Sequence, residues 1–209
     1  MDGLWAQGWR HFGTLFFRYE TAWHADRPFT VMPLRVALSQ FAPSRSQRRI
    51  AARNRDVEVA IRAAAIDENK QRLFDRHRQR FKESVPTSIY EFLSERPASV
   101  PCPNWEICVY LGGRLVAVSF LDIGQTATSA VYAMFDPAES RRSLGIFTML
   151  VAISHSRERG CRYYYPGYAY RERSVYDYKK NFAGLEYLDW HGGWRPLADE
   201  QQRAEVQTR

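Results

Sequence analysis

The stretch from Tyr132 to Gly145 joins a strand-forming apolar run to a helix-forming run, and it carries side chains that can do chemistry. The first N–H groups of a helix have no partner within the helix, so such a junction can bind a phosphate or stabilise an oxyanion. Arg142 and Ser143 stand at the predicted helix start and are candidate substrate-binding residues with Gly145. Asp136 ends the strand and is placed to hold an amino group or move a proton. An Asp-Pro turn or a helix N-cap explains Asp136 equally well, and both interpretations stay open.

A second set of candidate residues follows an aromatic strand. Five tyrosines lie between residues 163 and 170, and alternate strand residues face opposite sides, so half of them must face the core. We expect one or two tyrosines to contact a ligand, with Tyr132 and Tyr168 as the catalytic candidates. Gly167, Tyr178 and Lys179 are the further substrate-binding candidates, although a lysine at this position is also typical of an ordinary surface.

A basic run near the N-terminal quarter indicates a polyanionic partner. The chain has 30 Lys and Arg against 23 Asp and Glu, a net charge of +7. Each phosphate neutralised by a basic side chain releases counterions, which favours binding to nucleic acid. The alternative is a solvated helix face. The candidate tRNA-binding residues are Arg45, Arg48, Arg49 and Arg53.

The cysteines and histidines predict neither a disulfide framework nor a metal site. Cys102, Cys108 and Cys161 are odd in number and lack ligand spacing, which is typical of a protein in a reducing compartment. No histidine pair has the spacing of metal ligands, and His77 lies on the apolar face of a predicted helix, where a core role is expected. The apolar run 115–123 is too short to span a membrane and no signal core is visible, so we expect a cytoplasmic protein without membrane contact.

The order of the predicted elements indicates the fold class. Hydrophobic periodicity and turn residues predict strands near residues 33–38, 56–62, 105–111, 114–121, 128–135, 161–168 and 185–190, and helices near 44–54, 67–81, 87–93, 143–159 and 174–182. From Val57 this is β-α-α-β-β-β-α-β-α-β, the element order of the GNAT acyltransferase fold. We therefore predict an α+β protein with a GNAT-like mixed sheet and helices on both faces. Residues 1–55 are expected to form a small N-terminal extension, residues 56–200 the GNAT-like domain, and residues 201–209 a polar tail.

In GNAT proteins that use coenzyme A, the loop at the helix start resembles R/Q-x-x-G-x-G/A. Arg142 and Gly145 fit this pattern, but Phe147 stands where a small residue is needed for the backbone to approach the pyrophosphate. The mismatch favours a donor other than coenzyme A. A CoA-dependent N-acetyltransferase remains the alternative on the same fold.

Two blocks of sequence are similar to the arginyl- and leucyl-tRNA–protein transferases, including the bacterial aspartate/glutamate leucyltransferases. YAMFDPAESRRSLGIFTMLVAI followed by YYYPGYAYRERSVYDYKKNFAGLEYL resembles the C-terminal half of that family, and FAPSRSQRRIAARNRD resembles a basic stretch of its bacterial members. The matching positions include Tyr132, Asp136, Ser143, Gly145, Gly167, Tyr168, Tyr178 and Lys179. The chain departs from the family in having no cysteine in its N-terminal region, and in Val175, Tyr176 and Gly184, which replace a usual Lys-Met pair and proline.

The resemblance implies transfer of an amino acid, Arg or Leu, from charged tRNA to an amine of a protein, peptide or small molecule. Aminoacyl-tRNA is then a co-substrate, and no cofactor is expected. If the acceptor begins with Asp or Glu, a basic side chain must pair with its carboxylate, and Arg18, Lys179 and Arg171 are unranked candidates. A catalytically degenerate relative that only binds tRNA or protein is the second alternative.

Overall fold

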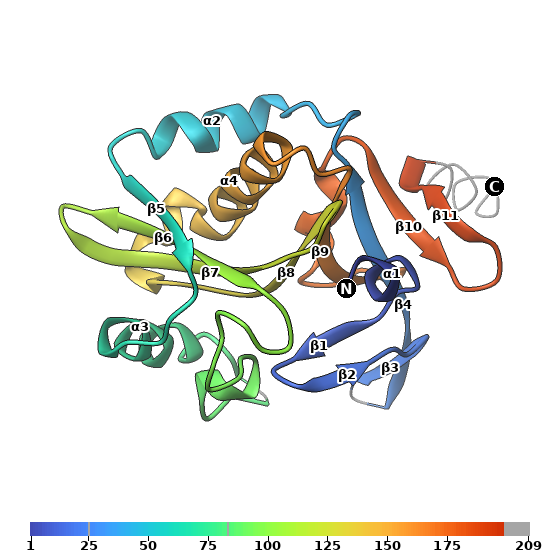
Figure 1. The fold of residues 1–209 in the computed structure, drawn as a ribbon, viewed down its shortest axis with the longest axis horizontal. Helices are drawn as coiled ribbons and strands as arrows, with labels where there is room; N and C mark the ends of the chain where they lie inside the picture. The colour runs from blue at the N-terminus through green and yellow to red at the C-terminus, as the bar shows by residue number, and fades with distance from the viewer. Residues whose placement is uncertain (25, 83, 199–209) are drawn as a thin grey trace.

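A computed structural model describes residues 1–24, 26–82 and 84–198, and its main feature is one large mixed sheet (Figure 1). Within these residues the sheet has nine strands in the order β11-β10-β4-β9-β8-β7-β6-β5, with β3 also paired to β4. β8 and β9 are parallel, and the other strand pairs of this sheet are antiparallel within the described residues. The strands are β3 (Thr21–His24), β4 (Arg27–Ala37), β5 (Glu58–Ala63), β6 (Asn104–Leu111), β7 (Arg114–Ile123), β8 (Ala127–Phe135), β9 (Tyr163–Tyr170), β10 (Leu185–Asp189) and β11 (Gly193–Pro196).

Helices cover both faces of this sheet, as the sequence predicts. α2 (Arg45–Arg53) and α4 (Leu144–Glu158) lie over one face, and α3 (Glu68–Arg78) lies over the other (Figure 1). α2 begins with the predicted capping box, in which Ser44 and Gln47 each accept a hydrogen bond from the other's backbone N–H. α1 (Asp2–Ala6) and the small β1 (Arg10–Phe12) and β2 (Leu15–Phe17) sheet lie on the same side of the sheet as α3.

The core fills both sides of the sheet. Under α4, β4 and β9 contribute Leu34, Val36 and Tyr164 to a cluster that also contains Met149 and Ile153 of the helix. On the α3 face, a second cluster combines Leu73, Phe74, Val118, Phe120 and Met134. Along β7, for example, Val118 and Phe120 face α3, which is the two-residue period by which the strands were predicted.

The three-stranded meander β6-β7-β8 leads to the parallel pair that positions the site. Gly112 and Gly113 connect β6 to β7 with φ values of 56° and 76°, the positive angles of the predicted type I′ hairpin. The chain then crosses from β8 through α4 to β9. β8 and β9 pair only through residues 127–129 and 163–165, so the C-terminal parts of both strands separate from each other.

The structure differs from the sequence prediction at three places. Residues 1–55 were expected to form a small N-terminal extension packed on the GNAT-like domain, and within that range β4 lies inside the sheet itself, between β9 and β10. The helix expected after Thr87 is a single 3-10 turn, η1 (Ile89–Glu91), capped by Ser88. The helix expected over residues 174–182 is also a 3-10 turn, η3 (Asp177–Asn181). The predicted tail at residues 201–209 lies outside the described residues.

Candidate active site

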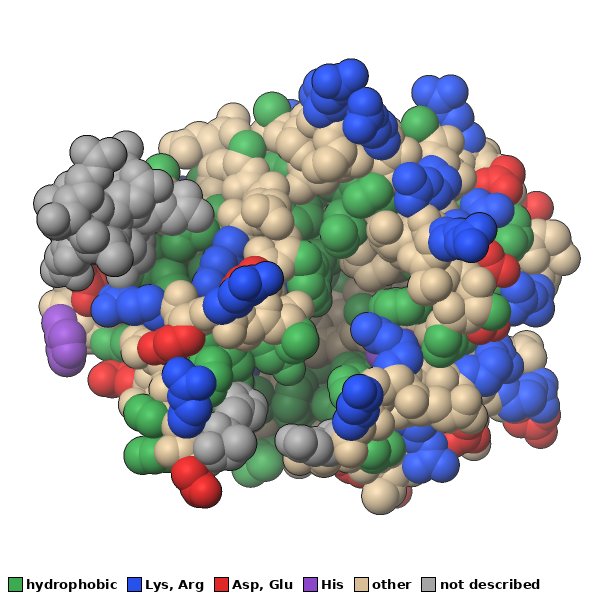
Figure 2. Space-filling view, turned by 180° about the vertical axis from the view of Figure 1, so that it is seen from behind, with side chains coloured by type: hydrophobic (Ala, Val, Ile, Leu, Met, Phe, Trp, Pro, Cys, Tyr) green, Lys and Arg blue, Asp and Glu red, His purple; other side chains and the backbone are tan. Residues whose placement is uncertain are grey.

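The separation of β8 from β9 opens a cleft in the centre of the sheet. Beyond residue 129 of β8 and residue 165 of β9 the two strands are no longer paired, so the backbone and side chains at their C-terminal ends can face a ligand. Figure 2, which views the molecule from behind, shows a hollow near the centre of the molecule. Hydrophobic side chains form its walls, and Lys and Arg side chains lie beside it.

Three of the predicted residues meet on the β9 side of this cleft. Lys179 of η3 donates from Nζ to the backbone oxygen of Tyr168 over 2.9 Å. Gly167 has a φ of 96°, and a Cβ on it would stand 3.3 Å from Lys179 Nζ and 3.7 Å from Arg10 Nη2. The Tyr168 hydroxyl donates to Gly8 O over 2.6 Å, and burial raises its pKa. The structure therefore joins Gly167, Tyr168 and Lys179 and adds Arg10, which sequence reasoning did not identify.

Lys179 and Arg10 are both desolvated cations. Burial, and to a lesser extent the charge of Arg10, lowers the pKa of Lys179 to about 7. Arg10 donates from Nη2 to Ala130 O of β8, while its buried Nη1 has no hydrogen-bond partner among the described residues. Asp122 of β7 is the acidic group that acts on Arg10, but its carboxylate is already bonded to His11 and Asn104.

Aromatic residues form the β8 side of the cleft. Tyr132 stacks on Phe92 with ring centroids 3.9 Å apart, and its buried hydroxyl has no partner in the described part of the chain. Burial raises the pKa of Tyr132, so this hydroxyl stays protonated at neutral pH. Arg80 lies over the Phe135 ring at 4.4 Å and acts electrostatically on both Tyr132 and Tyr178. Tyr178, on η3, remains 39% exposed at the edge of the same region.

His77 is a core residue, as its position on the helix predicts. Its side chain is 2% exposed, and Phe135 N–H lies 3.0 Å from Nδ1. Burial lowers its pKa to about 4, so the imidazole is neutral at physiological pH.

The predicted substrate-binding residues at the start of α4 make contacts within the protein, and their binding role stays a prediction. Arg142 forms a two-pronged ion pair with Asp56, with distances of 2.8 and 2.9 Å, and so fixes the loop before α4 to the loop before β5. Ser143 adopts a left-handed conformation and accepts hydrogen bonds at its backbone oxygen from Ile146 and Phe147. Gly145 lies beside Phe135, which would be 3.6 Å from an added Cβ.

Asp136 is engaged in structural contacts. It caps η2 (Pro137–Arg142) by accepting from Ala138 N–H, and its Oδ2 lies 2.6 Å from Arg114 Nη1 and 3.2 Å from Arg76 Nε. The turn and capping interpretation therefore has direct geometric support. The catalytic interpretation of Asp136 stays a prediction.

The predicted tRNA-binding arginines lie on one exposed helix. Arg45, Arg48, Arg49 and Arg53 are all exposed on α2, and Arg53 donates to Arg141 O next to the start of α4. Figure 2 shows Lys and Arg side chains gathered along the upper edge of the molecule, where α2 lies. These residues are accessible to a polyanion, and tRNA binding by them stays a prediction.

The fold brings together His11, Cys102 and Asp122, a combination of potential metal ligands that sequence spacing did not indicate. His11 Nε2 lies 2.6 Å from Asp122 Oδ2, and His11 Nδ1 lies 3.0 Å from Gly13 O. Since both ring nitrogens already contact oxygen atoms, the buried pair satisfies itself without an ion. The expectation that the protein holds no metal stays a prediction.

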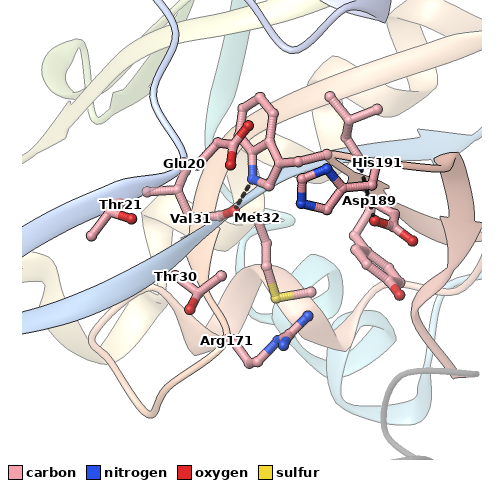
Figure 3. Close-up of a pocket in the computed structure, with 11 residues that line it drawn as sticks. Glu20, Thr21, Thr30, Val31, Met32, Arg171, Asp189 and His191 are labelled. Carbon is pink, nitrogen blue, oxygen red and sulfur yellow. Dashed lines mark hydrogen bonds between the residues drawn. The ribbon is translucent and has the colours of Figure 1, made fainter.

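A pocket of about 230 Å³ lies away from this cleft, between β4, β10 and the segment before β3 (Figure 3). It is lined by Glu20, Thr30, Met32, Arg171 and Asp189, among others. Several of its polar groups have partners within the protein: the Trp190 indole donates to Val31 O, and Asp189 accepts from His191 N–H and pairs with Arg195. Arg171, one of the three unranked basic candidates, belongs to this pocket. Arg18, another of these basic candidates, lies over the Trp190 ring.

Among the described residues, every helix is too short or too polar to cross a bilayer.

Comparison with known proteins gives consistent matches. The family model "Arginine-tRNA-protein transferase, C terminus" matches residues 69–189. An aspartate/glutamate leucyltransferase of Marinobacter nauticus is 30% identical over 200 residues, which cover 94% of this chain and 82% of the relative. A protein of the same name from Stenotrophomonas maltophilia is 33% identical over 195 residues, covering 88% of this chain and 76% of the relative.

Solved structures show the same architecture at low sequence identity. FemX superposes with a TM-score of 0.53 at 9% identity, covering 83% of this chain and 60% of that protein. L-PGS from Bacillus licheniformis superposes with a TM-score of 0.52 at 12% identity, covering 70% of this chain and 48% of that protein. At these identities the likeness concerns the fold alone, and it agrees with the predicted GNAT-like arrangement.

Proposed function

Because this chain belongs to the arginine-tRNA-protein transferase family, we propose that it transfers an amino acid from charged tRNA to the N-terminal amine of an acceptor protein. The transferred amino acid is leucine, and the acceptor begins with Asp or Glu. The names of both relatives support these two assignments. A small-molecule acceptor, which the sequence left open, has no support from them.

The β8–β9 cleft is the observation that carries this proposal. It lies where the two parallel strands separate: Gly167 and Tyr168 belong to β9, Lys179 bonds to Tyr168, and Tyr132 belongs to β8. Phe147, the mismatch to the coenzyme A loop, packs in the core with Val109 and Leu144. A bulky core side chain at this position disfavours the close pyrophosphate approach of a CoA-dependent acetyltransferase.

The chemistry is aminolysis of an ester. The neutral acceptor amine attacks the aminoacyl carbonyl carbon, a C–N bond forms, and the C–O bond to the tRNA ribose breaks, with the ribose oxygen regaining a proton. Free α-amino groups have a pKa of about 7.7 to 8.0, so a useful fraction is neutral near pH 7.5. An ester is already activated, and the protein mainly supplies proximity and hydrogen bonds to the developing oxyanion. The unpartnered Tyr132 hydroxyl is available for that purpose once substrate fills the cleft.

The test is a transfer assay with two donors. The protein is incubated with radiolabelled leucyl-tRNA or arginyl-tRNA and a reporter protein that begins with Asp, Glu or Ala. We expect ribonuclease-sensitive label at the N-terminus of the acidic reporters, from leucyl-tRNA. Tyr132→Phe should lower turnover by roughly 10- to 100-fold without unfolding the protein. Binding of both tRNAs without any transfer would establish a non-catalytic relative instead, and transfer of acetyl from acetyl-CoA would establish the acetyltransferase.

A further inference from the structure

Two partly buried basic side chains, Lys179 and Arg10, lie beside one point of the cleft, and the acidic group that acts on Arg10, Asp122, is already bonded to other residues. Lys179 Nζ bonds to the Tyr168 backbone oxygen, and Arg10 Nη2 bonds to the Ala130 backbone oxygen. In the described part of the chain neither side chain forms an ion pair, and Arg10 Nη1 has no acceptor at all. Neutral carbonyls do not compensate the desolvation of two neighbouring positive charges, so the free protein is electrostatically incomplete here.

The backbone of Gly167 marks where the missing anion fits. A single carbon atom added to Gly167 would lie 3.3 Å from Lys179 Nζ and 3.7 Å from Arg10 Nη2, so both cations border the same small volume. Gly167 has a φ of 96° and no side chain, so it places no atom of its own between the two basic groups. A carboxylate that approaches Lys179 Nζ and Arg10 Nη2 can accept a hydrogen bond from both nitrogens.

The residues around Gly167 favour a carboxylate at the end of a side chain over a phosphodiester as the bound anion. The Tyr168 ring, which follows Gly167, packs edge-on against Phe17 and Tyr19 with centroids 6.0 and 5.5 Å apart. A phosphodiester carries a nucleoside on each side and suits an open surface such as the α2 arginines. The side chain of a first residue enters an enclosed subsite from one side only.

We propose that Arg10 and Lys179 form the subsite that binds the side-chain carboxylate of the acceptor's first residue. The inference rests on the proposed function, because it assigns the acceptor specificity of that same cleft. A carboxylate held at Gly167 leaves the α-amine of the same residue free to reach an ester bound further along β8. The asparagine or glutamine analogue has the same shape but leaves both cations without a counter-charge.

The subsite also predicts a dependence on pH. The charged and titratable groups around the Lys179 amine are Arg10 from β1, Tyr168 from β9 and Tyr176 beside η3, while Asp122 from β7 acts on Arg10. With a pKa of about 7, Lys179 is protonated below pH 7 and binds the carboxylate directly. Above pH 7 the free enzyme must first take up a proton, so its preference for an acidic acceptor falls by up to about tenfold per pH unit.

The experiment uses four peptides that are identical after the first residue, beginning with Asp, Asn, Glu or Gln, with leucyl-tRNA as donor. The measured quantity is the ratio of kcat/KM for each acid to kcat/KM for its amide, because the titration of the α-amine largely cancels in that ratio. For the unaltered protein we expect a ratio on the order of 100 at pH 6.5. Lys179→Met and Arg10→Met should each reduce this acid-to-amide ratio to a value of about 2 to 5, while transfer to the amide peptides continues. Lys180→Met is the matched control, because the neighbouring lysine pairs with Asp177, and it should keep the ratio.

Lys179→Arg separates charge from packing. Its side chain stays charged at every pH tested, so the ratio should persist and lose its decline above pH 7. An acid-to-amide ratio near one in the unaltered protein, or an undiminished ratio in Lys179→Met and Arg10→Met, overturns this inference while leaving the transferase function in place. No transfer to any of the four peptides contradicts the proposed function itself. Melting temperatures of all variants show whether a loss reflects unfolding.

Discussion

Replacement of Gly167 by alanine tests the cleft geometry most directly. The change adds one methyl group at a φ of 96°, a left-handed conformation that alanine adopts at a cost of about 1–2 kcal/mol. The methyl carbon would also lie 3.3 Å from Lys179 Nζ, closer than an ordinary contact. Lys179 must then shift by a few tenths of an ångström, which strains its 2.9 Å hydrogen bond to Tyr168 O.

Gly160→Ala separates the strain from the contact. Gly160 ends α4 with a φ of 73°, and an added Cβ would meet no atom within 4 Å. Both variants therefore carry a similar backbone cost, which for a domain of this size lowers the melting temperature by roughly 2–8 °C. Only Gly167→Ala places an atom in the cleft.

The assay is transfer of leucine from leucyl-tRNA to a peptide that begins with Asp, at a temperature well below both melting transitions. We expect Gly160→Ala to retain kcat/KM within about twofold, and Gly167→Ala to lose at least about 30-fold by displacing Lys179. Equal kcat/KM for the two variants at equal folded fraction would show that the space beside Gly167 is not used by substrate.

Three further predictions concern residues away from Gly167. Asp136→Asn should lower stability by about 2 kcal/mol, seen by urea unfolding, because the cap and the contacts with Arg114 and Arg76 weaken; a 100-fold loss of turnover in fully folded protein would instead establish a catalytic role. Replacing the four α2 arginines together by alanine should weaken tRNA binding and reduce the slope of log K against log salt, as measured by filter binding; these residues are Arg45, Arg48, Arg49 and Arg53. An unchanged slope would exclude these arginines as tRNA contacts. Elemental analysis should find no stoichiometric metal, since His11 and Asp122 already bond to each other; about one equivalent that disappears in Cys102→Ser would refute this.

Local signals in the sequence predicted local structure well. The capping box at Ser44 and Gln47, the hairpin at Gly112 and Gly113, and the apolar face of α4 depend on residues close together in the chain, and each is confirmed. The segment at η1 was expected as a helix from a Thr87 cap and the apolar residues Ile89, Phe92 and Leu93, and the segment at η3 was also expected as a helix. Phe92, which follows η1, stacks on Tyr132 of β8, a tertiary contact that local sequence does not indicate.

Long-range pairings account for what the sequence did not reveal. Arg142 has the position of a phosphate ligand, but its partner Asp56 lies 86 residues away, a pairing that no spacing pattern indicates. Arg10 lies in an aromatic segment without clear period, and the β1–β2 sheet brings it to Ala130 of β8. The cleft residues Gly167, Tyr168 and Lys179 were identified because they match motifs of the transferase family, whereas Arg10 lies in a segment that matches no such motif and comes from the other end of the chain.

The position of β4 also has a consequence for synthesis of the protein on the ribosome. β4 precedes its sheet neighbours β9 and β10 in the chain, with β5 to β8 and α2 to α4 between them. Until β9 and β10 have emerged, Val31, Leu34 and Val36, all buried in the finished protein, have no neighbouring strand except β3. The nascent chain therefore carries an apolar strand with an open edge while the intervening elements are made, which favours pairing with another chain at high expression.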